Sequence, residues 1–323
     1  MDSAARRPTA FFIGDVALDV YFTAERWPGL ADKASFRETG SYVGGSIANA
    51  AAVHAGLGGS TEFISLLNHG ALTERLLEDL GNHGLKTTHM LYHPEVPDSR
   101  NMIFLVGGEH VVLYAEVGNL PMAVPAAAMV ALRSPGHLYM TLSRARRLRA
   151  AGNDGGELAG DEVLADLRSH GRRLVFDLDV DGFTAEEAAY LRGADVIILN
   201  EIGFGLSFGG QDLAAVNDWM RSNEVRTIIR TLAAAGAEIY DGAGVQTVPG
   251  YTIPVVDVTG AGDTFGGALV FALAESTDLR SAVESAVAAA SRAVTIEGPR
   301  GGVASSRQVE EFRRSQAVPL ATS

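Results

Sequence analysis

The sequence predicts an α/β fold in which helices cover both faces of a mainly parallel central sheet. After Asn119, short apolar segments of strand length alternate with segments of helical length, which is the pattern of a parallel sheet. One β-hairpin in the N-terminal half stands outside this alternation. With 323 residues, of which 47% are apolar, the chain can bury a large core, and no repeat or linker divides it. We therefore expect one domain over residues 1–323.

The N-terminal half contains two strand–helix pairs and the hairpin. A strand pattern ends at Gly14, and an alanine-rich helix pattern begins at Ser46, a helix-capping residue, and ends before Gly58. The elements predicted here are strands Thr9–Ile13 and Thr61–Leu66, helices Ser46–Leu57 and Ala71–Leu80, and hairpin strands Met102–Val106 and Val111–Tyr114.

The second half supplies four more strands and most of the helices. Its strand candidates are the apolar runs Leu138–Thr141, Arg173–Asp177, Val196–Leu199 and Thr227–Thr231. Its helix candidates are Asp161–His170, Ala185–Arg192, Asp212–Arg221, Thr264–Ala274 and Leu279–Val294. We expect Ala150–Gly160 to be a mobile loop inside the domain and the chain after Arg314 to be frayed.

The composition excludes several kinds of partner and site. The 26 basic and 39 acidic residues give a formal charge of −13, which disfavours binding to nucleic acid or to an anionic membrane surface. The absence of cysteine excludes disulfides, thiolate nucleophiles and cysteine-ligated metals. Neither of the two lysines, Lys33 and Lys86, follows a glycine, so there is no Walker-A phosphate loop. Because Met1–Arg7 is not followed by the apolar segment of a secretory signal, we expect a cytoplasmic protein without a membrane span.

The segment Asp257-Val-Thr-Gly-Ala-Gly-Asp263 carries the strongest chemical signal. Gly260, Ala261 and Gly262 are small residues at the start of a predicted helix, where backbone N–H groups and the helix dipole attract an anion. Asp263 follows within the first turn, and a carboxylate there is suited to take a proton from a hydroxyl that attacks a phosphoryl group. An aspartate at this position can equally serve as a helix cap, and the residues alone leave both interpretations open.

Two further segments offer groups that bind hydroxyls. Gly44 and Gly45 precede the alanine-rich helix, and Asn49, in its first turns, carries a donor and an acceptor. Asp15 and Asp19 follow the first predicted strand. Carboxylates at a strand end can accept hydrogen bonds from a sugar, although a solvated turn is the simpler interpretation of either one alone.

These three segments, in this order and at these distances, resemble the ribokinase-like (PfkB) family of sugar and nucleoside kinases. Gly44-Gly45 with Asn49 is similar to the family's N-terminal signature, and Asp257-x-Thr-Gly-Ala-Gly-Asp263 is similar to its more specific C-terminal one. The resemblance extends from about Phe11 to Gly302. It implies a three-layer α/β/α fold with a small β-lid, formed here from about 22–42 and 98–118, that closes over the sugar and often makes a dimer interface.

The resemblance also implies roles for single residues. Asp263 matches the catalytic base, and Gly260, Ala261 and Gly262 match the anion hole that receives the transferred phosphoryl group. The sugar-binding positions that it implies are Asp15, Asp19, Gly44, Gly45 and Asn49. The positions that it implies for ATP and its ions are Asn200 near Mg²⁺, Thr231 and Gly236 along the nucleotide, and Thr259 beside a monovalent cation such as K⁺.

Three departures from the family pattern bear on function. The usual Asn-x-x-Glu motif ends in Gly203 here, after Asn200, so no metal ligand can be assigned. Ala233 stands where the nucleotide loop usually has glycine, which is tolerable unless the position needs a positive φ. Ala17 replaces the asparagine of ribokinases proper, and the lost amide argues against ribose in particular.

We therefore expect an ATP- and Mg²⁺-dependent kinase that transfers the γ-phosphate to a hydroxyl of a small sugar or sugar derivative, and that dimerises through the lid. Two alternatives stay open. One is a nucleoside kinase on the same fold. The other is a sugar-binding regulatory protein with little turnover, which the changes at Gly203 and Ala233 favour.

Arginines outside these motifs receive simpler interpretations. Arg144, Arg146, Arg147 and Arg149 form a cluster that could bind phosphate, but an exposed helix face is the favoured interpretation. Arg300 lies in a glycine-rich loop, where a structural role and a ligand-binding role are equally favoured.

Overall fold

An eight-stranded sheet forms the centre of the structure, a computed structural model that describes residues 8–107, 109–115, 120–152, 155–276 and 278–317. Its strands are β1 (Ala10–Ile13), β4 (Thr61–Ile64), β10 (Gly136–Met140), β13 (Arg172–Asp179), β14 (Val196–Asn200), β15 (Ile228–Thr231), β16 (Gly236–Tyr240) and β17 (Val245–Pro249). They lie in the order β17-β16-β15-β14-β13-β10-β1-β4. All neighbours from β4 to β15 pair in parallel, and β16 and β17 add an antiparallel edge that the sequence patterns missed.

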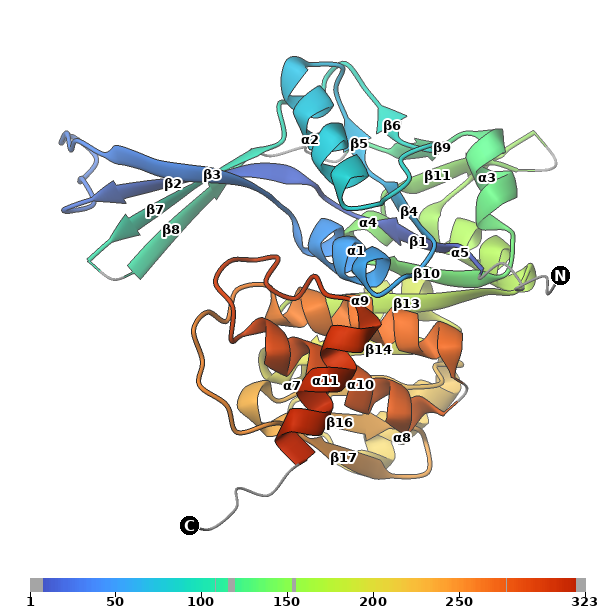
Figure 1. The fold of residues 1–323 in the computed structure, drawn as a ribbon. Coiled ribbons are helices and arrows are strands. Elements are labelled where there is room, and N and C mark those ends of the chain that lie inside the picture. The colour runs from blue at the N-terminus through green and yellow to red at the C-terminus, as the bar shows by residue number, and fades with distance from the viewer. Residues whose placement is uncertain (1–7, 108, 116–119, 153–154, 277, 318–323) are drawn as a thin grey trace, which may run out of the picture.

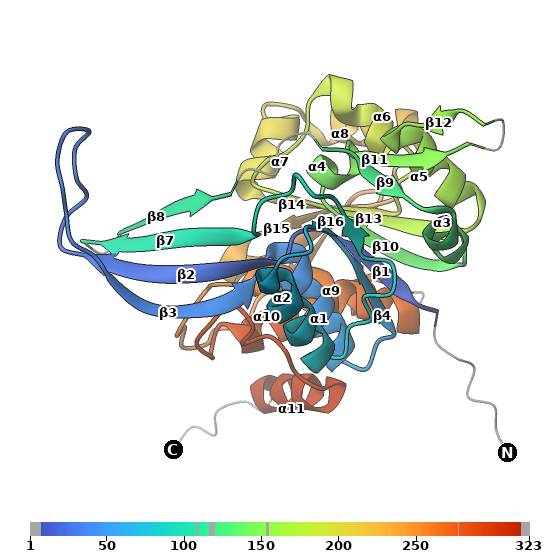
Figure 2. The ribbon, with the colours of Figure 1, turned by 90° about the horizontal axis from the view of Figure 1, so that it is seen from above.

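Helices cover both faces of this sheet and make the three layers (Figure 1). One face carries α1 (Ser46–Gly56), α2 (Ala71–Asn82), α9 (Ala261–Glu275), α10 (Leu279–Ala293) and α11 (Ser306–Ala317). The other carries α3 (Ala126–Leu132), α4 (Leu142–Ala145), α5 (Gly160–Ser169), α6 (Ala188–Leu191), α7 (Glu201–Phe208) and α8 (Leu213–Ser222). Figure 2 shows the two groups on opposite sides of the strands. None of the helices in the described ranges combines the length and the apolarity that crossing a bilayer requires.

The strands separate two hydrophobic cores because their side chains alternate between the faces. In β1, Phe12 belongs to the core beneath α1 and α9, whereas Phe11 and Ile13 belong to the core beneath α3 and α5. In β10, Tyr139 belongs to the first of these cores and Leu138 to the second. Strands buried on both faces read as continuous apolar runs, which is why the sequence located them well.

A four-stranded sheet projects from the body of the molecule (Figure 1). It contains β2 (Ala17–Ala24), β3 (Arg37–Gly44), β7 (Arg100–Val106) and β8 (Glu109–Tyr114), in the order β3-β2-β7-β8. We call these four strands, with the connection 25–36, the lid sheet. Its first strand starts at Ala17, five residues before the segment expected from sequence, and residues 108 and 116–118 of the expected lid lie outside the described residues.

Two expectations about irregular segments are wrong. Residues 150–160 are not a loop throughout, because β11 (Leu148–Ala151) pairs with β12 (Glu157–Leu158) and, on its other side, with β9 (Met122–Val124). Of this segment, residues 153–154 lie outside the described residues. The chain is not frayed directly after Arg314, since α11 continues to Ala317, beyond which the residues are also outside the described ranges. A short parallel pair, β5 (Leu66–Leu67) and β6 (Leu91–Tyr92), completes the strands.

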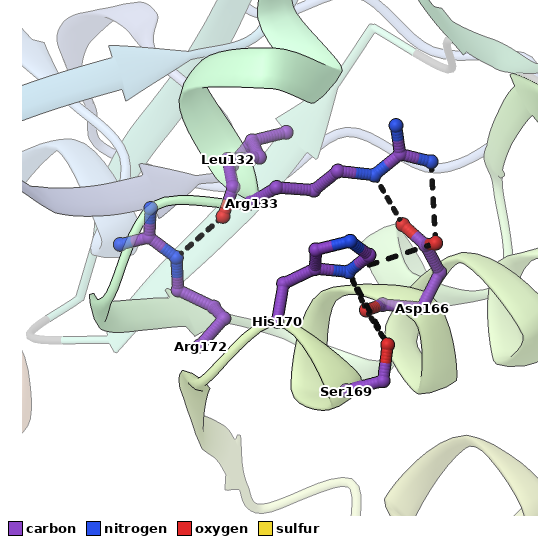
Figure 3. Close-up of polar contacts among 6 residues, drawn as sticks. All are labelled: Leu132, Arg133, Asp166, Ser169, His170 and Arg172. Carbon is purple, nitrogen blue, oxygen red and sulfur yellow. Dashed lines mark hydrogen bonds and ion pairs between the residues drawn. The ribbon is translucent and has the colours of Figure 1, made fainter.

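A buried arginine anchors the C-terminal end of α3 to the start of β13 (Figure 3). The guanidinium of Arg172 donates to the carbonyls of Leu132 at 2.7 Å and Ala131 at 3.0 Å, and burial lowers the pKa of Arg172 to about 10. Next to it, Arg133 donates twice to the carboxylate of Asp166 in α5, at 2.8 and 3.2 Å. The last carbonyls of α3, which no helical N–H can satisfy, are thereby paired.

Candidate active site

Polar residues gather where the parallel strands end. Asp15 lies in the loop after β1, Asp179 ends β13, Asn200 ends β14 and Thr231 ends β15. The carboxyl ends of neighbouring parallel strands open onto one edge of a sheet, which is where α/β proteins bind their ligands.

The N-terminus of α9 presents an open, glycine-lined surface at this edge. Gly260 is the residue before the helix and has a left-handed φ of 76°. A Cβ there would lie 2.1 Å from the carbonyl oxygen of Pro299, so only glycine fits. Ala261 begins the helix, and a Cβ added at Gly262 would meet no atom within 4 Å. The backbone N–H of Ala261 donates to the carbonyl of Val258 at 3.2 Å, whereas the N–H groups of Gly260 and Gly262 have no acceptor among the described residues. The start of α9 therefore offers N–H groups and room for an anion.

Asp257 holds the loop that leads into this helix. Its carboxylate accepts hydrogen bonds from the backbone N–H groups of Thr259 at 2.9 Å and Gly298 at 2.8 Å. Partial burial raises the pKa of Asp257, but the hydrogen bonds outweigh burial, and the net shift is downward. The predicted cation-binding residue Thr259 is exposed beside it.

Asp263 lies in the first turn of α9 and touches α1. The amide Nδ2 of Asn49 donates to its Oδ2 at 2.8 Å. The pKa of Asp263 is raised to about 7, chiefly by burial and also by the negative charges of Asp177 and Asp179, against the lowering effect of the Asn49 hydrogen bond. A carboxyl group with this pKa is half ionised near neutral pH, which suits a general base better than a helix cap.

A second pair of carboxylates lies behind the predicted base. The Tyr139 hydroxyl donates to Asp177, whose pKa burial raises to about 6. Asp179 accepts a hydrogen bond from Asn200 Nδ2 at 2.9 Å, and burial raises the pKa of Asp179 as well. Asn200 Oδ1 in turn accepts from the backbone N–H of Gly203 and caps α7. Glu201 is not part of this group, because its carboxylate lies 3.7 Å from Arg230.

Arg300 connects the base to α2. Its Nε donates to Asn49 Oδ1 at 3.2 Å, which leaves the Asn49 amide turned so that Nδ2 reaches Asp263. The Arg300 Nη1 group binds Asp79 and lies 3.0 Å from His83 Nδ1. Arg300 therefore positions the Asn49 amide, which is the structural role that its sequence context allowed.

The predicted sugar-binding residues on the lid sheet meet at its base. Asp19 of β2 accepts a hydrogen bond from Asn101 of β7 at 2.7 Å. Burial raises the pKa of Asp19, against the opposing effects of Asn101 and Arg300. A Cβ at Gly44 would overlap the Asp19 carboxylate, and Gly45 has a φ of 109° with the Asp15 carbonyl 2.3 Å from where its Cβ would be. Both glycines are thus required by close packing around Asp15 and Asp19.

The arginine cluster is not an exposed helix face, contrary to the favoured interpretation. The helix α4 has only four residues, and Arg144 within it is 8% exposed and forms an ion pair with Asp15. Arg147 is half-buried and donates from Nε to the carbonyl of Leu120 at 2.7 Å. Arg146 does face outward, where it pairs with Glu187.

The predicted nucleotide loop runs from β15 to β16. Thr231 pairs in register with Asn200, and Gly236 has a φ of 101° with the Val248 carbonyl 2.1 Å from where its Cβ would be. Ala233 has a φ of 47°, so this position does need the positive φ at which the family's glycine would be free of strain. Thr231 and Gly236 share the sheet edge with Asn200, and among the described residues no hydrogen bond joins either of them to Asp263.

Replacing Ala233 with glycine is expected to raise stability by up to about 1 kcal/mol, because relief of a left-handed φ outweighs the entropy that glycine adds to the unfolded chain. Urea denaturation measures the change. Ala235→Gly is the matched control in the same turn, since Ala235 has no positive φ, and it is expected to lower stability by about 0.5–1 kcal/mol. Equal losses in both variants would contradict the assignment of strain to Ala233.

Hydrogen bonds thus join Asp263, Asn49 and Arg300, and the charge of Arg300 also acts on Asp19. Asp179 and Asn200 form a second hydrogen-bonded pair, and the charge of Asp179 acts on Asp263. Sequence reasoning missed Asn101, Asp177 and the buried state of Arg144. Asp177 carried a usable signal, a carboxylate at the end of a predicted strand. Asn101 carried none, because its partner Asp19 is 82 residues away.

Comparisons with known proteins agree with this fold. The profile of the pfkB family of carbohydrate kinases matches residues 8–305. Ribokinase of Bacillus subtilis is 24% identical over 304 residues, covering 93% of this chain and 97% of the relative. Arabidopsis thaliana ribokinase, solved with ribose and ATP, superimposes with a TM-score of 0.80 at 22% identity over 95% of this chain and 98% of the other. The nucleoside kinase of Methanocaldococcus jannaschii has a TM-score of 0.72 at 18% identity, covering 96% and 99%.

The predicted ribokinase-like α/β fold is therefore confirmed, and the chain belongs to the pfkB family of carbohydrate kinases.

Proposed function

We propose that this protein transfers the γ-phosphate of ATP to a hydroxyl of a small sugar or sugar derivative. The observation that carries the proposal is the position of Asp263, a partly buried carboxylate with a pKa near 7, in the first turn of a helix whose N-terminus is open to an anion. An anion site and a base side by side are what phosphoryl transfer to a hydroxyl needs.

In this mechanism Asp263 accepts the proton of the acceptor hydroxyl as its oxygen bonds to the γ-phosphorus and the bond to the β–γ bridging oxygen breaks. Asn49 holds the carboxylate in place through its 2.8 Å hydrogen bond. Gly260, Ala261 and Gly262 would form the anion hole, in which the N–H groups of Gly260 and Gly262, which have no acceptor among the described residues, stabilise charge that develops on the phosphoryl oxygens. Asp15, Asp19, Gly44 and Gly45 would bind the sugar, and closure of the lid sheet would exclude water.

The nucleotide would lie along the edge formed by Asn200, Thr231 and Gly236. The oxygen donors at this edge fit Mg²⁺, which binds through one or two carboxylates and keeps its waters. No three such side chains form a metal cage within the described ranges, but the exposed carboxylate of Asp179 beside Asn200 can take the place of the missing glutamate. When bound, Mg²⁺ neutralises phosphate charge. A monovalent cation such as K⁺ would bind near Asp257 and Thr259, where the lowered pKa keeps Asp257 ionised.

The value of kcat/KM for the acceptor is expected to fall below about pH 7, by about tenfold per pH unit, because only ionised Asp263 accepts a proton. The measurement is kcat/KM for the acceptor against pH at saturating ATP. Asn49→Ala removes a hydrogen bond that lowers the pKa, so its midpoint is expected to move upward. A rate independent of pH from about 5.5 to 8.5 would contradict the assignment.

The direct test of the proposed function is ADP release, coupled to a reporter enzyme, over a panel of sugars, sugar derivatives and nucleosides. Turnover of a sugar supports the proposal. Faster turnover of a nucleoside favours the alternative that the archaeal nucleoside kinase of the same fold suggests. Tight sugar binding without turnover at any Mg²⁺ concentration would favour a regulatory protein instead.

The lid sheet also suits a homodimer interface. It exposes large apolar side chains, namely Trp27, Phe36, Tyr42, Leu105 and Leu113, each at least 42% accessible. Trp27 and Phe36 both pack against Phe104, and the strand register puts Leu113 on the face of Phe104, whereas Tyr42 and Leu105 lie on the other face. Exposed apolar groups gathered on one face mark contact surfaces. Light scattering after gel filtration is expected to give twice the 33.9 kDa chain mass, and the chain mass alone would contradict the dimer.

A further inference from the structure

A basic cavity adjoins the proposed sugar-binding residues. It has a volume of about 400 Å³ and lies between the loop after β1, the first turn of α1, the lid sheet and the segment that contains α4. Asp15 and Gly45 of the proposed acceptor site line it, together with Asn101, which donates to Asp19 of the same site. A molecule bound there would extend away from the acceptor hydroxyl.

The charge of this cavity is opposite to that of the chain. Three arginines, Arg100, Arg144 and Arg147, line it, and Asp15 is the one acidic residue among the described residues that do. The lining is therefore positive in a protein whose formal charge is −13. A positive pocket in an acidic protein concentrates anions and excludes cations.

Two of these arginines have buried N–H groups with no acceptor. Arg144 is 8% exposed, and its Nε is buried without a partner although the other end of the guanidinium binds Asp15. Arg147 uses Nε on the Leu120 carbonyl and leaves Nη2 buried and unpaired. Burial lowers the pKa of Arg147, and the neighbouring charge of Arg144 lowers it further, against the opposing effect of Asp15. Unpaired buried donors are rare because each costs free energy. Both of these donors belong to side chains that line the cavity, so an anion bound there, toward which the guanidinium groups could turn, would remove this cost.

We propose that the natural acceptor is an anionic sugar derivative, whose carboxylate or phosphate group binds Arg144 and Arg147 while Arg100 lies at the lid side of the cavity. This inference rests on the proposed kinase function and names the substrate class. Guanidinium groups present planar donors that match both anions, whereas a neutral hydroxyl would leave most of the donors unpaired. Asp15 holds Arg144 in place and keeps a half-exposed carboxylate for a sugar hydroxyl.

The first test is binding without ATP, measured by calorimetry. The ligands are two matched sets: ribose, ribonate and ribose 5-phosphate, and glucose, gluconate and glucose 6-phosphate. At least one anionic member is expected to bind about tenfold or more tightly than its neutral counterpart, as for a hydrogen-bonded charge. Preference for the acid over the phosphate, or the reverse, identifies which anion is bound. Equal or weaker binding of all anionic members overturns the proposal.

Variants separate the anion site from a purely structural role. Arg147→Met is expected to weaken binding of the preferred anion about tenfold to a hundredfold and to leave its neutral counterpart unchanged. Arg147→Lys should restore part of the affinity, and Arg144→Met should repeat the loss if it folds. Arg146→Met is the matched control, since Arg146 is a neighbouring residue that pairs with Glu187 outside the cavity. Equal losses for neutral and anionic ligands in Arg147→Met would overturn the inference.

The same ligands in the ADP-release assay keep the two proposals apart. Turnover of neutral sugars alone, without any effect of Arg147→Met, would leave the kinase function standing and end the anion proposal. Anion binding that depends on Arg147 without turnover of any ligand would support the anion site and end the kinase proposal.

Discussion

Replacing Asp263 with asparagine is expected to lower kcat by about a hundredfold to ten-thousandfold, the range for loss of a general base. Asparagine has nearly the same size, so the change removes the proton acceptor and little else. The measurement is kcat at pH 8, where wild-type Asp263, with a pKa of about 7, is ionised. Acceptor affinity should change far less, because sugar contacts are assigned to other residues.

The same variant is expected to melt at or above the wild-type temperature at pH 8. Folding raises the pKa of Asp263 from 3.8 to about 7, so between these values the folded state holds a proton that the unfolded state releases. The contribution of this group to stability therefore falls as pH rises through that window, and a neutral side chain avoids the loss. Lost activity with an unchanged or higher melting temperature excludes misfolding. Retention of most of the wild-type rate would refute the assignment of the base.

Replacing Gly260 with alanine is expected to cost about 2–4 kcal/mol of stability, as the sum of a left-handed φ for a residue with Cβ and an overlap in a packed loop. The new Cβ would lie 2.1 Å from the Pro299 carbonyl oxygen, so the start of α9 must move. Because the anion hole is made of the same backbone, kcat should fall at least about a hundredfold, as when a donor is removed from an oxyanion hole. Urea denaturation and steady-state kinetics measure the two effects.

Gly262→Ala is the matched comparison, two residues further along the chain. A Cβ there meets nothing within 4 Å, and alanine favours a helix over glycine by about 1 kcal/mol, so stability should be equal or higher. Its methyl group nevertheless enters the space assigned to the phosphoryl group, and kcat should still fall. The proposed anion site is wrong if Gly262→Ala is fully active, and the argument for strain is wrong if Gly260→Ala is as stable as wild type.

The sequence predicted the central parallel strands better than the antiparallel edge of the sheet and the lid sheet. Strands such as Val196–Leu199 are buried on both faces and therefore read as plain apolar runs. The edge strand β17 was missed because four of its five residues are exposed and it has no apolar run. β16 is mostly buried, but it was missed because Gly236 and Glu238 interrupt its apolar pattern. The lid sheet was only partly located, since its register depends on pairing between β2 and β7, which are far apart in the chain.

In the candidate site, too, residues in a local motif could be predicted from sequence, whereas residues that depend on distant contacts could not. Asp263 and Gly260 were predictable because the motif places them in one helical turn, where dipole and spacing act locally. Arg144 was misjudged because nothing in a run of arginines tells which one packs against Asp15, 129 residues earlier. The strain at Ala233 depends on a backbone angle that composition does not reveal, although the resemblance marked the position.

The two tryptophans lie in different parts of the molecule, so their intrinsic fluorescence can report on each part. Trp27 is 47% exposed beside Phe104 in the lid sheet, whereas Trp219 packs between Phe183 and Phe208 in the core on the α8 side. Movement of the lid sheet would alter the polarity around the first indole and leave the second as an internal standard. Emission from the unlabelled chain therefore separates closure over an acceptor from a change in the body of the protein.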